Sequence, residues 1–378
     1  NLLWLAGFDP RFEEALLVIG PEPRPLVITG IECEQYLRIS PLFRAGGLRQ
    51  ARCDAFSLPG IAVDAGVSLE KLLRQEGLTA KARVACAGWK AGAHDTPFWI
   101  LDVVSTLTGG AVANAAGLFS DPDCGLRATV DANELAWFEH ANAKTSEALR
   151  RVLFSIRPGA RDFELLAEAR YDGSPMGCDW GLKTGADRIS LSSPRGMAVE
   201  PGDALTVNLS YRGANCCRAG RVAAEGSNEF IERFGDAMVD WLAHLEIGAI
   251  GGELTARLPW TLAYAPGHLI HYEEWLETPF RPGSTTALRS GMLIQSDISP
   301  SSPEHGPARF EDGWALADEA LRHELAAAHP AVQDRCQRRR RFLESLGYRL
   351  PEELLPLSNT AGIIAPWLLD PALVLASP

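Results

Sequence analysis

Hydrophobic and polar positions alternate in the middle of the chain, and this alternation predicts a β-hairpin over residues 202–226. Apolar side chains stand at Leu205, Val207 and Leu209, as in a strand that has one face against a core. A Pro-Gly-Asp turn comes before this strand, and Gly213 marks the turn into a returning strand. The pattern therefore predicts two antiparallel strands in succession.

The first third of the chain alternates short apolar runs with a helical pattern. The runs are bounded by Gly and Pro, as buried strands are, and they predict strands at residues 1–5, 15–19, 25–29 and 83–89. Residues 67–73 have the spacing of an amphipathic helix, with Ser68 as its N-cap. Alternation of strands and helices favours an α/β layer with a mixed or parallel sheet.

The pattern changes near residues 126–131, where we expect a domain boundary. A long helix is predicted from 132 to 156, and Asp162 is an N-cap or first-turn acid of the helix that follows it. Further helices are predicted at 228–248 and 315–347, with strands between 178 and 226 and from 258 to 312. The chain is thus expected to hold two domains, residues 1–130 and 131–378.

Composition narrows the class of protein. The chain has 378 residues and a net charge of −12, which argues against nonspecific nucleic-acid binding. The basic run 338–341 is interpreted as a solvated helix face. No apolar run approaches the roughly 18–20 residues of a membrane span. The eight cysteines include no CxxC pair, which favours a reducing, cytoplasmic compartment. Because the chain begins at Asn1 without Met, we expect the natural N-terminus, and any targeting segment, to lie upstream.

Five short segments, in this order, resemble the creatinase, prolidase and aminopeptidase P family. They are Asn-Leu-Leu-Trp-Leu-Ala-Gly-Phe at 1–8, Ile-Arg-Pro-Gly at 156–159, the Pro-Gly-Asp turn at 201–203 with its hairpin, Ser-Gly-Met-Leu-Ile at 290–294 followed by Asp297, and Arg-Phe-Glu-Asp at 309–312. The resemblance implies an α+β pita-bread domain over 131–378 and an α/β creatinase-type N-terminal domain over 1–130. It also implies a homodimer in which the N-terminal domain closes over the partner's site.

Peptidases of this family hold two divalent ions with two aspartates, one histidine and two glutamates. Bridging carboxylates suit such a pair, which activates a water molecule near neutral pH. The resemblance places the last glutamate at Glu311 and the other at Asp297. It places the first aspartate at Asn208, and the second at Asn215, Cys217 or Ala219. The hairpin holds no carboxylate between Asp203 and Glu225, so the negative charges that would offset two dications are missing from it.

The histidine ligand falls within residues 263–271, and two placements stay open. A placement without gaps puts Tyr264 at the ligand and His271 at the family's second histidine, whereas a shifted placement puts His268 at the ligand. The stretch that follows is rich in polar and aromatic side chains up to Trp275. It is typical of the rim of a pocket, although packing remains an alternative role for Trp275.

These residues support three hypotheses. The first is a divergent, metal-free member, without cofactor, that binds or hydrolyses a small amino-acid or peptide derivative. His271 or His268 would be its general base, and Asp297 or Glu311 would orient that base. Its substrate-binding residues would be Asn208, Tyr264, Cys217 and Trp275. Creatinase activity itself is not supported, because no histidine occurs in residues 190–194, where the resemblance would place it.

The second hypothesis is a mononuclear peptidase for Xaa-Pro-like peptides, with one zinc or manganese ion on His268, Asp297 and Glu311, and Cys217 as a fourth ligand. The third is a non-catalytic protein that uses, as a binding surface, the cleft in which the family's peptidases hold their active site. Cys217 as a nucleophile is a further alternative, which requires a nearby base and a lowered thiol pKa.

Overall fold

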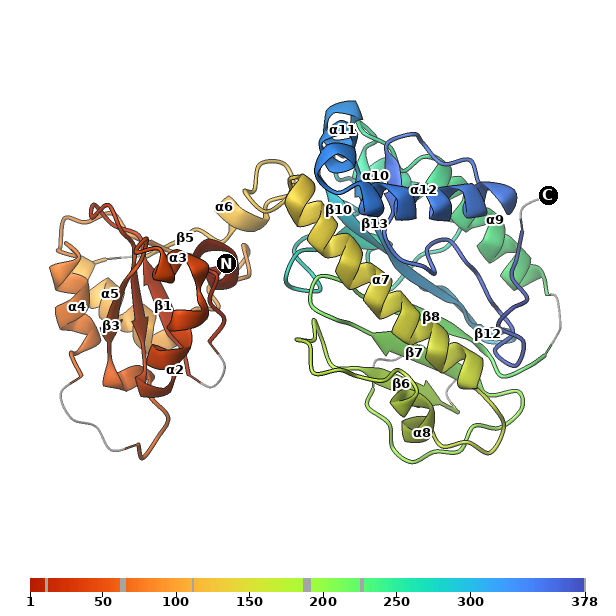
Figure 1. Cartoon of the computed structure of the whole chain (residues 1–378), viewed down its shortest axis with the longest axis horizontal. Helices are drawn as coiled ribbons and strands as arrows, with labels where there is room; N and C mark the ends of the chain where they lie inside the picture. Colours follow the sequence, from red (N-terminus) through yellow and green to blue (C-terminus); the bar gives the residue numbers. More distant parts are fainter. Residues whose placement is uncertain (11–12, 62–65, 111, 186–191, 225–227, 377–378) are drawn as a thin grey trace. The chain divides into compact units, whose positions relative to one another are not determined.

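The chain forms two compact units, Asn1–Asp121 and Pro122–Pro378, in the computed structural model (Figure 1). The structure describes residues 1–10, 13–61, 66–110, 112–185, 192–224 and 228–376. The boundary between the units falls a little before the predicted one, and the long helix that opens the C-terminal unit begins at Ala132. In the described part of the chain, none of the helices has the length and apolarity needed to cross a membrane.

The N-terminal unit is a mixed α/β layer. Its larger sheet has the order β1-β2-β3, in which β1 is antiparallel to β2 and β2 is parallel to β3. The strands are β1 (Ala15–Val18), β2 (Leu26–Thr29) and β3 (Arg49–Arg52), with a second parallel pair, β4 (Ala85–Cys86) and β5 (Ala113–Asn114). The helices are α1 (Leu2–Ala6), α2 (Ile31–Tyr36), α3 (Pro41–Arg44), α4 (Leu69–Gln75), α5 (Phe98–Thr108) and α6 (Gly117–Ser120), with short 3-10 turns at Leu37–Ile39 and Asp54–Phe56. Apolar residues of β2, α4 and α5 share one core cluster.

The predicted helix at 67–73 is confirmed as α4, and the Ser68 hydroxyl accepts a hydrogen bond from the Lys71 amide at 3.3 Å. The predicted strand at residues 1–5 is wrong, because these residues form helix α1. A short apolar run does not by itself separate a strand from a buried helical turn. The deciding residue is Gly7, whose left-handed φ of 60° lets its amide close the helix on the Leu3 carbonyl.

The C-terminal unit is built on a seven-stranded sheet with the order β6-β7-β8-β13-β10-β9, and β14 pairs with β13. All of these pairs are antiparallel. The strands are β6 (Gly181–Thr184), β7 (Ala204–Leu209), β8 (Cys216–Arg221), β9 (Gly267–Leu269), β10 (Leu293–Ile298), β13 (Arg309–Leu316) and β14 (Leu354–Pro356), and β11 (Ser301–Ser302) and β12 (Gly306–Pro307) form a small separate ribbon. The predicted hairpin is therefore confirmed as β7 and β8, with Gly213 in the turn at φ 86°.

The helices of this unit are α7 (Ala132–Ser155), α8 (Asp162–Ala167), α9 (Glu229–Ala243), α10 (Gly251–Ala256), α11 (Glu319–Ala328) and α12 (Pro330–Ser345). Val207 of β7 packs with α7, and Ile294 of β10 and Phe310 of β13 pack with α9 and α10. Because neighbours along a strand point to opposite faces, the residues next to these apolar ones point away from that packing. The sheet therefore has a second face, on which polar residues gather.

The basic run 338–341 is only partly a solvated face, which corrects the prediction. Arg339 forms an ion pair with the buried Glu139 of α7 at 2.7 Å. Arg340 donates to backbone carbonyl groups, including that of Pro351 at 2.6 Å. These two arginines thus fix α12 against α7 and the following loop, while Arg338 and Arg341 are exposed. The sequence did not show this because Glu139 is distant along the chain.

Candidate functional site

Strand register places a row of polar positions across one face of the seven-stranded sheet. Asn208 of β7 is paired with Cys217 of β8, and Cys217 is paired with Glu311 of β13. Glu311 is in turn paired with Asp297 of β10. Directly paired residues of neighbouring strands point to the same face, so these four side chains form a continuous row.

Strand β9 adds a histidine to this face. His268 is paired with Gln295, which stands two residues before Asp297 on β10 and so points to the same side. Residues from the adjoining loop and turn complete the group. We call it the polar cluster, and it consists of Asn208, Asn215, Cys217, His268, Glu274, Gln295, Asp297, Arg309 and Glu311.

Arg309 holds both carboxylates that the sequence offered as metal ligands. Its Nε donates to Oδ1 of Asp297 at 3.0 Å, and its Nη2 donates to Oε2 of Glu311 at 2.7 Å. All three side chains are nearly or fully buried. Burial and the negative charge of Asp297 raise the pKa of the Glu311 carboxyl, and Arg309 offsets part of that rise. The guanidinium is therefore the cation that these two acids already share.

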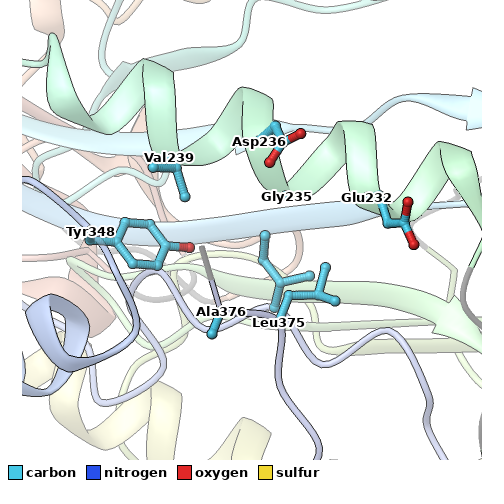
Figure 2. Close-up of a pocket in the computed structure, with 8 residues that line it drawn as sticks. Glu232, Gly235, Asp236, Val239, Tyr348, Leu375 and Ala376 are labelled. Atoms are coloured by element: carbon cyan, nitrogen blue, oxygen red, sulfur yellow. The ribbon is translucent and has the colours of Figure 1, made fainter. Parts of the chain in front are cut away.

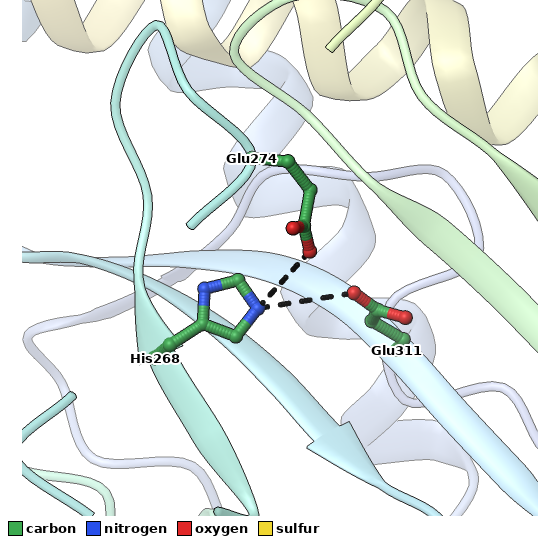
Figure 3. Close-up of side chains that lie close together, drawn as sticks. All are labelled: His268, Glu274 and Glu311. Carbon is green, nitrogen blue, oxygen red and sulfur yellow. Dashed lines mark ion pairs between the residues drawn. The ribbon is translucent and has the colours of Figure 1, made fainter. Parts of the chain in front are cut away.

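His268 is fully buried and faces two glutamates (Figure 3). Its Nε2 lies 3.4 Å from Oε1 of Glu274 and 4.0 Å from Oε1 of Glu311. The ring stacks on Trp275, with centroids 4.2 Å apart. The ligand atoms of the three ionisable residues all lie within 4.8 Å of one another, which is close enough for a shared ion.

Amide side chains surround the acids and leave several oxygen atoms without donors. Asn215 Nδ2 donates to Oε1 of Glu311 at 2.7 Å and to Oε1 of Glu274 at 3.3 Å. Gln295 donates to the backbone carbonyl of Asn215. Within the described part of the chain, the buried oxygens Oδ1 of Asn208, Oδ1 of Asn215 and Oε1 of Gln295 accept no hydrogen bond. Unpaired buried acceptors are costly, so a ligand that brings donors or positive charge would be favoured here.

The residues present do not fit a two-metal centre. The hairpin positions Asn208 and Cys217 supply no carboxylate, and burial raises the pKa of the Cys217 thiol so that it stays protonated. The two remaining acids, Asp297 and Glu311, are bound to a guanidinium. Two dications beside Arg309 would gather excess positive charge in a buried space, which is unfavourable.

His271 does not face the polar cluster. Its Nδ1 accepts a hydrogen bond from Arg127 at 3.2 Å, its Nε2 lies 3.8 Å from Glu134, and its ring contacts Phe138. Burial, together with the positive charge of Arg127, lowers the pKa of His271 to about 3. His268, which the shifted placement favours, is instead the histidine that faces Glu311.

Tyr264 also lies apart from the polar cluster. Its side chain is 64% exposed and lines a separate cavity of about 510 Å³, together with Trp260 and Phe280. Another cavity, of about 260 Å³, lies between α9 and the C-terminal segment (Figure 2). Glu232 and Asp236 line it on one side and Leu375 on the other. Neither set of lining residues includes a member of the polar cluster.

Glu274, Gln295 and Arg309 are the members of the site whose roles the sequence did not reveal. Glu274 lies in the stretch interpreted as a pocket rim, but only the fold brings it to His268. The signal for Arg309 was present, because residues two apart on a strand share a face and Arg309 stands two before Glu311.

Several solved structures of peptidases have folds similar to that of this chain. The chain superposes on an Xaa-Pro dipeptidase from Bacillus anthracis with a TM-score of 0.65 at 17% identity, covering 84% of this chain and 88% of that one. The prolidase from Pyrococcus furiosus superposes with a TM-score of 0.64 at 14% identity, covering 84% of this chain and 91% of that one. An X-Pro aminopeptidase from Thermotoga maritima MSB8 superposes with a TM-score of 0.62 at 15% identity, covering 84% of this chain and 89% of that one. Neither a protein-family model nor a curated protein matches the chain.

The comparisons define the class of fold. The C-terminal unit has the mixed α+β pita-bread fold of the prolidases and aminopeptidases P, and the predicted fold class is confirmed. At these levels of identity the likeness extends to the fold and not to the chemistry of the site. The function must therefore be argued from the polar cluster itself.

Proposed function

We propose that this chain is a divergent protein of prolidase fold that has lost the two-metal centre and binds a small amino-acid or short-peptide derivative at the polar cluster. The observation that carries the proposal is the placement of Arg309. Its guanidinium bonds to both Asp297 and Glu311, in a site whose hairpin offers Asn208 and Cys217 in place of acids. Of the three hypotheses from the sequence, we therefore keep the first, a divergent family member without the two-metal centre.

The chemistry of the cluster favours a ligand with N–H donors. The unpartnered atoms named above are oxygens of Asn208, Asn215 and Gln295, and Glu274 brings a carboxylate whose side chain is 25% exposed. An ammonium group supplies several donors and a positive charge at once, and charge-assisted hydrogen bonds of this kind are the stronger ones. The free amine of an amino acid or peptide therefore matches the acceptors on this face.

Hydrolysis of such a ligand is a second candidate, which the geometry of His268 favours. Its Nε2 lacks a hydrogen-bond partner within the described residues and lies beside Glu274. A histidine with a free ring nitrogen is able to take a proton from a bound water molecule. The roles assigned to His268 and Glu311 stay predictions, as do the cytoplasmic location and the homodimer.

The proposal is tested by measuring ligand binding and peptidase activity on the same chelator-treated preparation. A panel of amino acids, Xaa-Pro dipeptides and N-acetylated counterparts is screened by thermal shift, and each hit is titrated by calorimetry. We expect a free-amine compound to raise Tm in a saturable manner. Its N-acetylated counterpart should not do so, because the ammonium is then lost.

Asn208→Leu removes one acceptor and should weaken binding of the same compound by about 10-fold, a loss on the scale of one hydrogen bond. With added manganese, Ala-Pro should remain uncleaved. Manganese-dependent cleavage of Ala-Pro, with two metal ions bound per chain, would refute the proposal. So would a panel in which no free-amine compound stabilises the protein.

A further inference from the structure

The cavity beside Tyr264 is a second candidate binding site of this chain. Its volume of about 510 Å³ lies within the range of about 300–1,000 Å³ that is typical of small-molecule pockets. The aromatic side chains of Trp260, Tyr264 and Phe280 line it, together with Arg281 and with Thr255 of helix α10. We call it the aromatic cavity. None of its lining residues belongs to the polar cluster, so the proposed function does not use it.

Strand β9 separates the aromatic cavity from the polar cluster. His268 turns its ring toward Glu311, and its neighbour Gly267 points to the opposite side of the strand. On that side, a Cβ added to Gly267 would lie 3.2 Å from the ring of Phe280, which lines the aromatic cavity. The two sites therefore lie on opposite sides of one strand, and a ligand in one leaves the other open.

The indole ring of Trp260 is held in place without a ligand. Phe230 and Phe234 of α9 contact it, with ring centroids 6.3 and 6.1 Å away. The guanidinium carbon of Arg233 lies 5.5 Å from the centroid of the same ring, and Arg233 also donates to the carbonyl oxygen of Pro259 at 3.0 Å. A preformed aromatic wall loses little conformational entropy when a ligand binds. It therefore favours a flat ring that stacks against it.

Arg281 gives the aromatic cavity its charge. Among the described residues that line the cavity, Arg281 alone has a charged side chain. Its backbone is fixed, because its amide donates to Pro279 at 3.0 Å and its carbonyl oxygen accepts from Ser284 at 2.9 Å. In the part of the chain that the structure describes, the guanidinium itself has no ion pair and no hydrogen bond. A guanidinium of this kind binds a carboxylate through two parallel hydrogen bonds.

We infer that the aromatic cavity binds a small aromatic carboxylate, with its ring against Trp260 and its carboxylate on Arg281. Tyr264 is 64% exposed and lies at the opening, where it would cover the bound ring. The whole chain has a net charge of −12, so the preference for an anion comes from this one side chain and not from a general positive field. A neutral analogue of the same shape would leave the guanidinium unpaired and should bind less tightly.

The experiment compares two indoles of nearly the same shape by calorimetry on the full chain. Indole-3-acetate carries a carboxylate, whereas indole-3-acetamide carries a neutral amide, and neither has the ammonium group that the polar cluster favours. We expect indole-3-acetate to bind saturably with one site per chain. Indole-3-acetamide should bind at least about 10-fold more weakly, because it forms no charge-assisted pair with Arg281.

Variants locate the bound indole. Arg281→Met should weaken binding of indole-3-acetate at least about 10-fold and remove the preference for the acid over the amide. Tyr264→Ala should weaken both compounds and keep that preference, since it removes ring contact and no charge. Arg341→Met, the same change on the exposed side of α12, is the matched control and should bind as the unchanged protein does. Asn208→Leu alters the polar cluster and should leave the affinity for indole-3-acetate unchanged.

The Tm of every variant is measured without ligand, so that a variant that fails to fold is recognised. Absence of saturable binding by indole-3-acetate, equal affinity for the acid and the amide, or unchanged affinity in Arg281→Met would overturn the inference. So would a loss of binding in Asn208→Leu alone, which would place the indole at the polar cluster. If indole-3-acetate binds as expected while no free-amine compound stabilises the protein, the proposed function fails and this inference stands.

Discussion

Arg309 and Glu311 stand two residues apart on strand β13, and the guanidinium of the first donates to the carboxylate of the second at 2.7 Å. Both side chains are buried, and Asp297 on the next strand completes the bridge at 3.0 Å. The polar cluster therefore depends on one cationic side chain for the charge balance of its interior.

Arg309→Met should lower the free energy of unfolding by about 3–5 kcal/mol, because it leaves two buried acids without their partner. Denaturant unfolding at pH 7 in the presence of chelator measures the change. The triple variant that also carries Asp297→Asn and Glu311→Gln should recover part of the loss, since no uncompensated charge remains. A loss below about 1 kcal/mol in the single variant would show that the acids are not charged in the native protein.

His271 should make the protein less stable in acid. Its pKa is about 3 in the folded chain because of burial and the nearby Arg127, against about 6.5 in the unfolded chain. Between these two values the unfolded state holds one more proton, so stability falls as pH falls below about 6.5. The slope from this residue approaches about 1.4 kcal/mol per pH unit.

His271→Gln removes that titration, so its free energy of unfolding should depend less on pH between about 6.5 and 4. Unfolding curves of both proteins at several pH values give the two slopes. The control is His244→Gln, because His244 is partly exposed at the C-terminal cap of α9. Equal slopes in His271→Gln and the unchanged protein would mean that another group carries the acid sensitivity.

Cys217 should not react with thiol reagents in the folded protein. It is fully buried, and burial raises the pKa of its thiol, so that little thiolate forms at pH 7–8. Cys124 is exposed and should be modified first. Peptide mapping after brief treatment with iodoacetamide distinguishes the two sites. Rapid modification of Cys217 would contradict this prediction and would support the alternative that Cys217 is a nucleophile.

Gly313→Ala should destabilise the C-terminal unit by about 1–3 kcal/mol through overpacking. A Cβ at this position would lie 2.1 Å from Oδ1 of Asn142, a buried side chain of the long helix α7. Gly92→Ala is the matched control, because a Cβ there meets nothing within 4 Å. Thermal unfolding of both variants gives the comparison, and an unchanged Tm for Gly313→Ala would show that α7 shifts without cost.

The elements best predicted from the sequence were those with strong local patterns. The hairpin followed from alternating apolar residues around Gly213, and the long helix α7 from its periodicity. Residues 1–5 were misassigned because a few apolar residues fit either a strand or a helical turn, and only the conformation of Gly7 separates the two. The spacing of apolar residues therefore sufficed to predict an element where it extended over several helical turns or several strand residues.

The site was harder to predict, because it depends on register between strands that are distant in the sequence. Only the pairing of β9 with β10 shows that His268, rather than Tyr264 or His271, faces Glu311, because it places His268 beside Gln295. Glu274 joins the site from a loop, and no periodicity indicates the direction of a loop side chain. The absence of carboxylates between Asp203 and Glu225, by contrast, was visible in the sequence alone.

The bridge from Arg309 to Asp297 and Glu311 differs from a bridge made by a bound metal ion. A bound metal ion dissociates when its free concentration falls, and acids that depend on it then repel one another. A guanidinium is part of the polypeptide and cannot leave. These two acids therefore keep their counterion as long as the chain stays folded, at any free concentration of metal.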